Sequence, residues 1–175
     1  MMTLPSLDAP EAALLPVLGP LMLAAMWWDL RRMRIPNWLT GATAALFAPF
    51  AFWALGAEEV QARALGALAV LAACYAFFFF GRMGGGDAKL LAACALFVRP
   101  DDAAAALFLL AFWLGVGLAA LMAARAALEG RARSWKALRR GAHFPMGVSI
   151  GAAMISYLIL RARAPDVPAP FWLWG

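Results

Sequence analysis

Charged residues are scarce in this chain of 175 residues: only 14% are Asp, Glu, Lys or Arg, whereas 65% are hydrophobic. An ordinary soluble domain is about 45–50% apolar, and the mean hydropathy here is +0.77. The composition therefore excludes a soluble enzyme and predicts a membrane protein. A chain of this length has room for about six spans of roughly 20 residues and for little else, so we expect residues 1–175 to form one membrane-embedded domain.

Cysteine and histidine are rarer still than charged residues. The chain has two cysteines and one histidine. Cys74 and Cys94 lie inside apolar runs and form no CxxC pair, which excludes a zinc site of the thiolate type. His143 has no neighbouring ligands in the sequence, so we expect neither a metal ion nor a cofactor. Residues 1–9 contain no Lys or Arg, which is untypical of a secretory signal peptide, and we expect the first apolar run to stay in the protein.

Apolar runs predict an all-α fold, because lipid-facing backbone must satisfy its own hydrogen bonds. The fold class is therefore a polytopic membrane bundle of about six helices. The fourth run has about eleven residues, roughly 16 Å of helix, which is half of a ~30 Å hydrocarbon core. It could cross the membrane among neighbouring helices, or it could be re-entrant. The six runs cover residues 12–28, 38–56, 64–81, 88–98, 103–124 and 145–161.

The distribution of basic residues favours crossing. With six crossings and the N-terminus outside, the three inner connections hold 11 of the 15 Lys and Arg residues. If the fourth run turned back instead, the connection 125–140, with six basic residues, would lie outside. Basic residues prefer the cytoplasmic side. We therefore predict six crossings, with both termini outside.

This topology places two acids together at the cytosolic side. Asp29 ends the run "MWWDL", and Asp87 lies in "GGGDAK". An ionisable residue at the membrane boundary is a functional candidate by default. Each also has a structural interpretation: Asp29 could pair with Arg31 or Arg32, and Asp87 could cap the fourth helix. A cap does not require three consecutive glycines, so we expect the backbone before Asp87 to approach another group closely.

Two carboxylates that share one site suit the hydrolysis of a peptide bond. Like charges at about 3 Å resist joint ionisation, so the pair holds one proton. The carboxylate then takes a proton from the attacking water, while the carboxylic acid polarises the carbonyl and helps to protonate the amine.

Three motifs resemble those of bacterial type IV prepilin peptidases, which are GxGD intramembrane aspartic proteases. "DLRRMRIPNWLT" is similar to the first active-site region of that family. "MGGGDAKLLAA" is similar to the second, a Gly-x-Gly-Asp-x-Lys signature. "FPMGVSIGAA" is similar to the proline–glycine motif that opens the last helix, although Met146 stands where an aromatic residue is common. The matching positions are Asp29, Pro36, Asn37, Gly84, Gly86, Asp87, Lys89, Pro145 and Gly147.

The resemblance implies an endopeptidase that cleaves the basic leader of a prepilin at the cytosolic face of the bacterial inner membrane. Asp29 and Asp87 would be its catalytic pair, and Gly84 and Gly86 would let the loop move or approach the substrate. Larger members carry a cytosolic region with paired cysteines, associated with N-methylation of the pilin. Here the connection after Asp29 is short and lacks cysteine, so the chain looks like the short peptidases of Flp/Tad-type pilus systems.

Other residues near the acids have simpler interpretations. We expect Asn37 to cap the second helix behind Pro36, with substrate contact as the alternative. Lys89 could tune the acid pair or extend to lipid headgroups. The basic segment 125–140 is expected to lie on anionic lipid, and no fold that binds nucleic acid is visible. Small-residue runs such as "GVGLAALMAA" favour close helix packing and could equally serve a homodimer.

A membrane transporter or a pilus or secretion assembly subunit is the alternative function. In such a protein Asp29 and Asp87 would relay protons or bind cations. Carboxylates in proton relays usually lie in the membrane interior rather than together at one end, so the peptidase is the first choice.

Overall fold

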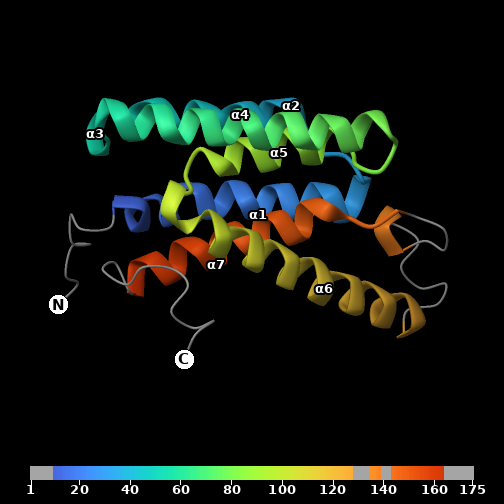
Figure 1. Cartoon of the computed structure of the whole chain (residues 1–175). Coiled ribbons are helices and arrows are strands. Elements are labelled where there is room, and N and C mark those ends of the chain that lie inside the picture. Colours follow the sequence, from blue (N-terminus) through green and yellow to red (C-terminus); the bar gives the residue numbers. More distant parts are fainter. Residues whose placement is uncertain (1–9, 128–134, 139–142, 164–175) are drawn as a thin grey trace.

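The computed structural model describes residues 10–127, 135–138 and 143–163. Within these ranges the chain is helical and contains no strand, so the predicted all-α bundle is confirmed (Figure 1). Both termini, which the charge pattern places outside, lie beyond the described residues. The elements are η1 (Pro10–Leu14), α1 (Leu15–Arg32), α2 (Asn37–Ala45), α3 (Phe47–Ala54), α4 (Ala57–Phe79), α5 (Gly85–Ala95), η2 (Pro100–Asp102), α6 (Ala103–Ala127), η3 (Lys136–Leu138) and α7 (Met146–Arg163).

The second apolar run, expected as one span, is divided into α2 and α3. Pro49 lies in the first turn of α3 and has no backbone N–H to donate to the carbonyl of Ala45, where α2 ends. Leu46 between the two helices keeps helical dihedral angles, with φ −64° and ψ −19°. The helical hydrogen bonds are therefore interrupted at this one position, while the backbone continues in a helical conformation.

Three helical segments are long and apolar enough to cross a membrane: Ala57–Phe79, Pro100–Ala127 and Met146–Arg163. Most of the exposed large hydrophobic side chains of the described residues belong to α4 and α6, as expected for helices that face lipid. α1 has the same length as α7 but ends in Asp29, Arg31 and Arg32. The chain is a membrane protein.

The predicted short fourth helix is present as α5, with 11 residues. It runs from the loop after α4 to the opposite end of the bundle, where α6 begins (Figure 1). Taken in chain order, α1, the α2–α3 pair, α4, α5, α6 and α7 alternate in direction along the bundle. A fourth segment that crosses the membrane stays a prediction, because α5 is not among the helices long enough to span it.

The helices pack as two groups. In the first, the α4 group, α5 packs on α4 and on α2, and α3 continues from α2. In the second, the α7 group, α7 packs on α1 and on α6, with η1 and η3 beside α1. Contacts of α5 with α7, of α1 with α2 and of α4 with η2 join the groups. The core between them is formed by large buried side chains, among them Leu18, Met22, Leu39, Leu90, Phe97, Ile150 and Leu158.

The two ends of the bundle differ. At one end, called here the site end, α1 terminates and α5 and α7 begin. At the other, the far end, η1 leads into α1, and α5 and α7 terminate. Asp29 lies in the last turn of α1 and Asp87 in the first turn of α5. Both acids are therefore at the site end, although they belong to different groups.

Candidate active site

Asp29 is held by a sharp ending of α1. Met33 caps this helix in the left-handed conformation, with φ 55° and ψ 36°, and its backbone N–H donates to the Asp29 carbonyl at 2.8 Å. The Asp29 side chain is only 4% exposed. Its Oδ2 accepts a hydrogen bond of 2.8 Å from the backbone N–H of Gly147.

The structural alternative for Asp29, an ion pair with Arg31 or Arg32, is wrong. The guanidinium of Arg31 lies over the Trp27 ring at 5.5 Å and that of Arg32 over the Trp28 ring at 5.6 Å. Among the ion pairs of the described residues, none involves Asp29. The carboxyl is therefore buried against a backbone amide rather than neutralised by a neighbouring cation.

Gly147 fits this position because it has no side chain. A Cβ there would lie 2.8 Å from Ile35 Cδ1 and 2.9 Å from Asp29 Oδ2. Pro145 stands just before α7, whose first residue is Met146, so the prediction that the proline–glycine motif opens the last helix is confirmed. The motif delivers an N–H group directly to Asp29.

Asp87 is not the cap of its helix, contrary to the structural interpretation. The N-cap of α5 is Gly84, with φ −73° and ψ 139°, and the backbone amide of Gly84 is one of the groups that lower the pKa of Asp87. Asp87 is the third residue of α5, and its Oδ1 is buried without a hydrogen-bond partner among the described residues. A buried oxygen of this kind is costly unless it has a function or a ligand.

The glycines before Asp87 are explained by close approach, as expected. A Cβ on Gly84 would lie 2.6 Å from Asp87 Oδ2, which leaves no room for a side chain. A Cβ on Gly86 would lie 3.3 Å from Ile35 Cβ and 3.4 Å from the Ile35 carbonyl oxygen. The start of α5 therefore packs directly on the connection between α1 and α2.

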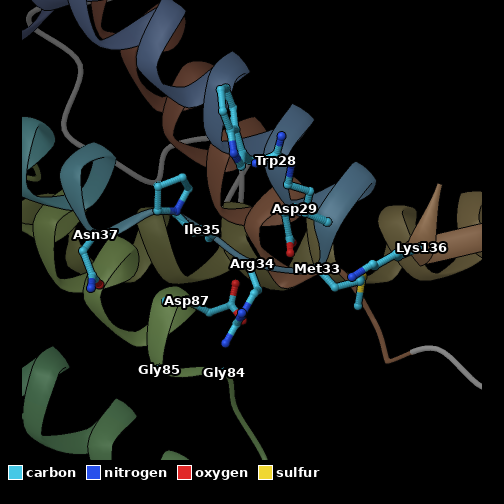
Figure 2. Close-up of a pocket in the computed structure, with 13 residues that line it drawn as sticks. Trp28, Asp29, Met33, Arg34, Ile35, Asn37, Gly84, Gly85, Asp87 and Lys136 are labelled. Carbon is cyan, nitrogen blue, oxygen red and sulfur yellow. The ribbon is translucent and has the colours of Figure 1, made fainter. Parts of the chain in front are cut away.

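Asp29 and Asp87 line one cavity of about 900 Å³. Figure 2 shows the two carboxyl groups directed into the same space from α1 and α5. The backbone from Arg32 to Asn37 forms one wall and Gly84 to Gly86 another. The cavity is lined by Trp28, Asp29, Arg32, Met33, Arg34, Ile35, Pro36, Asn37, Gly84, Gly85, Gly86, Asp87 and Lys136.

The remaining predicted site residues divide into two sets. Pro36 and Asn37 line the cavity. Pro36 rather than Asn37 is the N-cap of α2, so the predicted Asn37 cap is wrong. Lys89 does not line the cavity; its Nζ donates to Asn37 Oδ1 at 3.2 Å on an exposed surface. Lys89 therefore joins α5 to the start of α2.

Three basic residues of the cavity were not selected from the sequence: Arg32, Arg34 and Lys136. The two arginines lie inside the first motif, next to Asp29. Lys136 belongs to the basic segment 125–140, much of which lies beyond the described residues. Trp135, which precedes it, packs edge-on against Trp27 with ring centroids 5.3 Å apart. This aromatic pair connects the segment to α1.

Burial raises the pKa of both acids. Desolvation raises the pKa of Asp29 to about 6, although the Gly147 amide opposes this shift. Desolvation and the nearby charge of Asp29 together raise the pKa of Asp87 to about 7, and the backbone amides of Gly147 and Gly84 oppose this shift. Near neutral pH the pair therefore favours a state with one proton. No group of three or more His, Cys, Asp or Glu side chains that could hold a metal is found among the described residues.

Comparison with known proteins gives an independent result. The model of the type IV leader peptidase family matches residues 17–130, a segment that contains both acids. Searches of curated proteins and of solved structures found no match. Because the family match covers more than half of the chain, the protein belongs to the type IV leader peptidase family.

Proposed function

We propose that this protein is an intramembrane aspartic endopeptidase in which Asp29 and Asp87 form the catalytic pair. One observation carries the proposal: two acids that are distant in the chain line one cavity, and burial raises the pKa of both. Perturbed acids in a cleft are candidates for catalysis. Membership of a leader peptidase family implies peptidase activity, and the acid pair supplies a mechanism for it.

The environments of the two acids suggest which one is the general acid and which one is the general base. The backbone amide of Gly147 favours the ionised form of both acids, and its hydrogen bond of 2.8 Å goes to Asp29 Oδ2. Asp87 has the higher pKa and an unpartnered Oδ1. In the proposed ground state Asp87 therefore holds the proton and Asp29 is the base.

The proposed reaction begins when Asp29 takes a proton from water as the water oxygen attacks the scissile carbonyl carbon. Asp87 donates its proton to the carbonyl oxygen, which gives a neutral tetrahedral intermediate. Collapse of this intermediate breaks the C–N bond. The leaving amine takes the proton held by Asp29, and Asp87 recovers its proton from the hydroxyl that becomes a carbonyl again.

The proposed substrate is a prepilin, cleaved at the cytosolic face of the bacterial inner membrane. A prepilin is the substrate that the family implies. The cytosolic face is proposed because the site end carries Arg31, Arg32 and Arg34, and basic residues prefer that side. The scissile peptide must be extended there, since a helix holds its amides in internal hydrogen bonds.

We also propose the short, Flp/Tad-type form of the enzyme, without methyltransferase activity. Only residues 33–36 separate α1 from α2. Both cysteines are buried in helices, Cys74 in α4 and Cys94 in α5, rather than in a cytosolic insertion. The alternative of a proton or cation transporter is less well supported, because both acids lie on one cavity at one end of the bundle.

Co-expression with a candidate precursor tests the catalytic pair. The precursor should carry basic residues, then a glycine and a long apolar run, and cleavage is read as a size shift on an immunoblot. Asp87→Asn should abolish the shift and leave membrane insertion intact. Asp101→Asn changes an exposed acid at the far end in the same way and should cleave normally. Normal processing by Asp87→Asn would refute the proposal.

A further inference from the structure

The far end of the bundle contains a buried charge that the peptidase reaction does not use. The Arg63 side chain, in α4, is fully buried. It is paired with Glu11 in η1, which is 1% exposed, and with Glu59 one turn earlier in α4 at 2.6 Å. Its Nη1 donates to the Phe97 carbonyl at 3.1 Å. A buried arginine is expensive to desolvate, so this site calls for an explanation other than stability.

Two partners of Arg63, Glu11 and Phe97, adjoin the two helices that carry the acids. Glu11 precedes α1, whose last turn holds Asp29, and Phe97 follows α5, whose first turn holds Asp87. One guanidinium thus joins the far ends of α1 and α5. No other ion pair between described residues links the α4 group to the α7 group, since the pair of Asp102 with Arg161 joins η2 to α7.

We propose that Arg63 is a positioning residue that sets the separation of Asp29 and Asp87 from the opposite end of the bundle. This inference rests on the proposed function. The two acids belong to different groups, so the angle between the groups determines their distance. α1 is roughly 27 Å long, and a tilt of about 2° at its far end moves its other end by about 1 Å. A misplacement of that size can reduce catalysis about 100-fold.

The surroundings of Arg63 make this link rigid. Its guanidinium lies over the Phe50 ring at 5.7 Å, and Phe50 and Phe47 both pack against Phe97 with ring centroids 5.9 and 5.8 Å apart. Glu11 Oε2 has no partner among the described residues, so the contact from η1 depends on the other oxygen alone. Removing the Glu11 carboxylate therefore breaks the link between the groups, while Arg63 keeps Glu59 and the Phe97 carbonyl.

Two variants distinguish a role of Arg63 in positioning the acids from a role in merely pairing its own buried charge. Glu11→Ala removes the partner in the α7 group, and Glu59→Gln removes the charge of the partner within α4, on a side chain that is 39% exposed. For Glu11→Ala we expect a fall of tenfold or more in kcat with little change in KM. The alkaline limb of the pH profile should also move to lower pH, because a more distant Asp29 raises the pKa of Asp87 less. Glu59→Gln should behave as the unmodified protein.

A distance measurement tests the proposal without any activity. Spin labels on Arg31→Cys and Arg82→Cys, both exposed at the site end, report the separation of the groups once Cys74 and Cys94 are replaced by Ala. Glu11→Ala should lengthen or broaden that distance in nanodiscs, and Glu59→Gln should not. An unchanged distance and pH profile in folded Glu11→Ala would overturn the proposal, as would equal effects of both variants. If the unmodified protein cleaves no precursor, the peptidase proposal fails, and the spin-label distance still tests whether Arg63 sets the separation of the two groups.

Discussion

Asp29→Asn should abolish cleavage and at the same time make the protein more stable at alkaline pH. Burial raises the pKa of Asp29 from 3.8 to about 6, so the folded state prefers the neutral carboxyl by about two pH units. At about 1.4 kcal/mol per unit, ionisation of Asp29 costs the folded protein about 3 kcal/mol above pH 6. Asparagine is nearly isosteric, is never ionised and keeps an oxygen that can accept the Gly147 N–H.

The sign of the effect follows from the direction of the shift. Below pH 3.8 the carboxyl is neutral in both folded and unfolded chains, so it imposes no penalty. Between pH 3.8 and about 6 the unfolded chain ionises first and the penalty grows, and above pH 6 it is complete. The advantage of Asp29→Asn over the unmodified protein should therefore be larger at pH 8 than at pH 5, with about 3 kcal/mol as its upper limit.

Unfolding in detergent, followed at pH 5 and pH 8 by circular dichroism, measures this difference. Asp101→Asn provides the control, because Asp101 is exposed at the far end and should show no comparable gain. A stability difference that is the same at both pH values would refute the reasoning, because the cost would then not come from ionisation. Retained cleavage would remove Asp29 from the catalytic pair.

Two further predictions concern the same site. Gly147→Ala places a Cβ 2.9 Å from Asp29 Oδ2 and should lower the rate of cleavage about 100-fold. The control Gly115→Ala adds its Cβ in open space and should cleave normally. Equal losses of activity in the two detergent-purified variants would contradict this prediction. The value of kcat/KM should peak between about pH 6 and 7, because a lower pH protonates the base and a higher pH ionises the acid. A rate that stays flat up to pH 9 would exclude a shared proton.

Hydropathy and charge were sufficient to predict the helices and their order. Each of the six apolar runs overlaps at least one helix, because the membrane requires long uncharged segments with internal hydrogen bonds. The division of the second run depends on a single proline, Pro49, which an apolar average does not register. The buried pair of Glu11 and Arg63 was not foreseen, because residues 52 positions apart show no local pattern.

The acids of the site were predictable because so few charges occur in this chain. Asp29 and Asp87 stood out as carboxylates at helix ends on the side rich in arginine. Their partners were less accessible to such reasoning: the amide that reaches Asp29 belongs to a residue 118 positions away, and Lys136 reaches the cavity from a segment expected on lipid. The proline–glycine motif selected Gly147, but only the fold shows that its backbone N–H donates to Asp29.

The order in which the chain builds its two helix groups has a consequence for biosynthesis. The α4 group is inserted between α1 and the rest of the α7 group, so α1 enters the membrane long before its main partner, α7. Until α7 arrives, the amide that orients Asp29 is missing. The proposed catalytic centre is therefore complete only after the last helix, α7, has been synthesised.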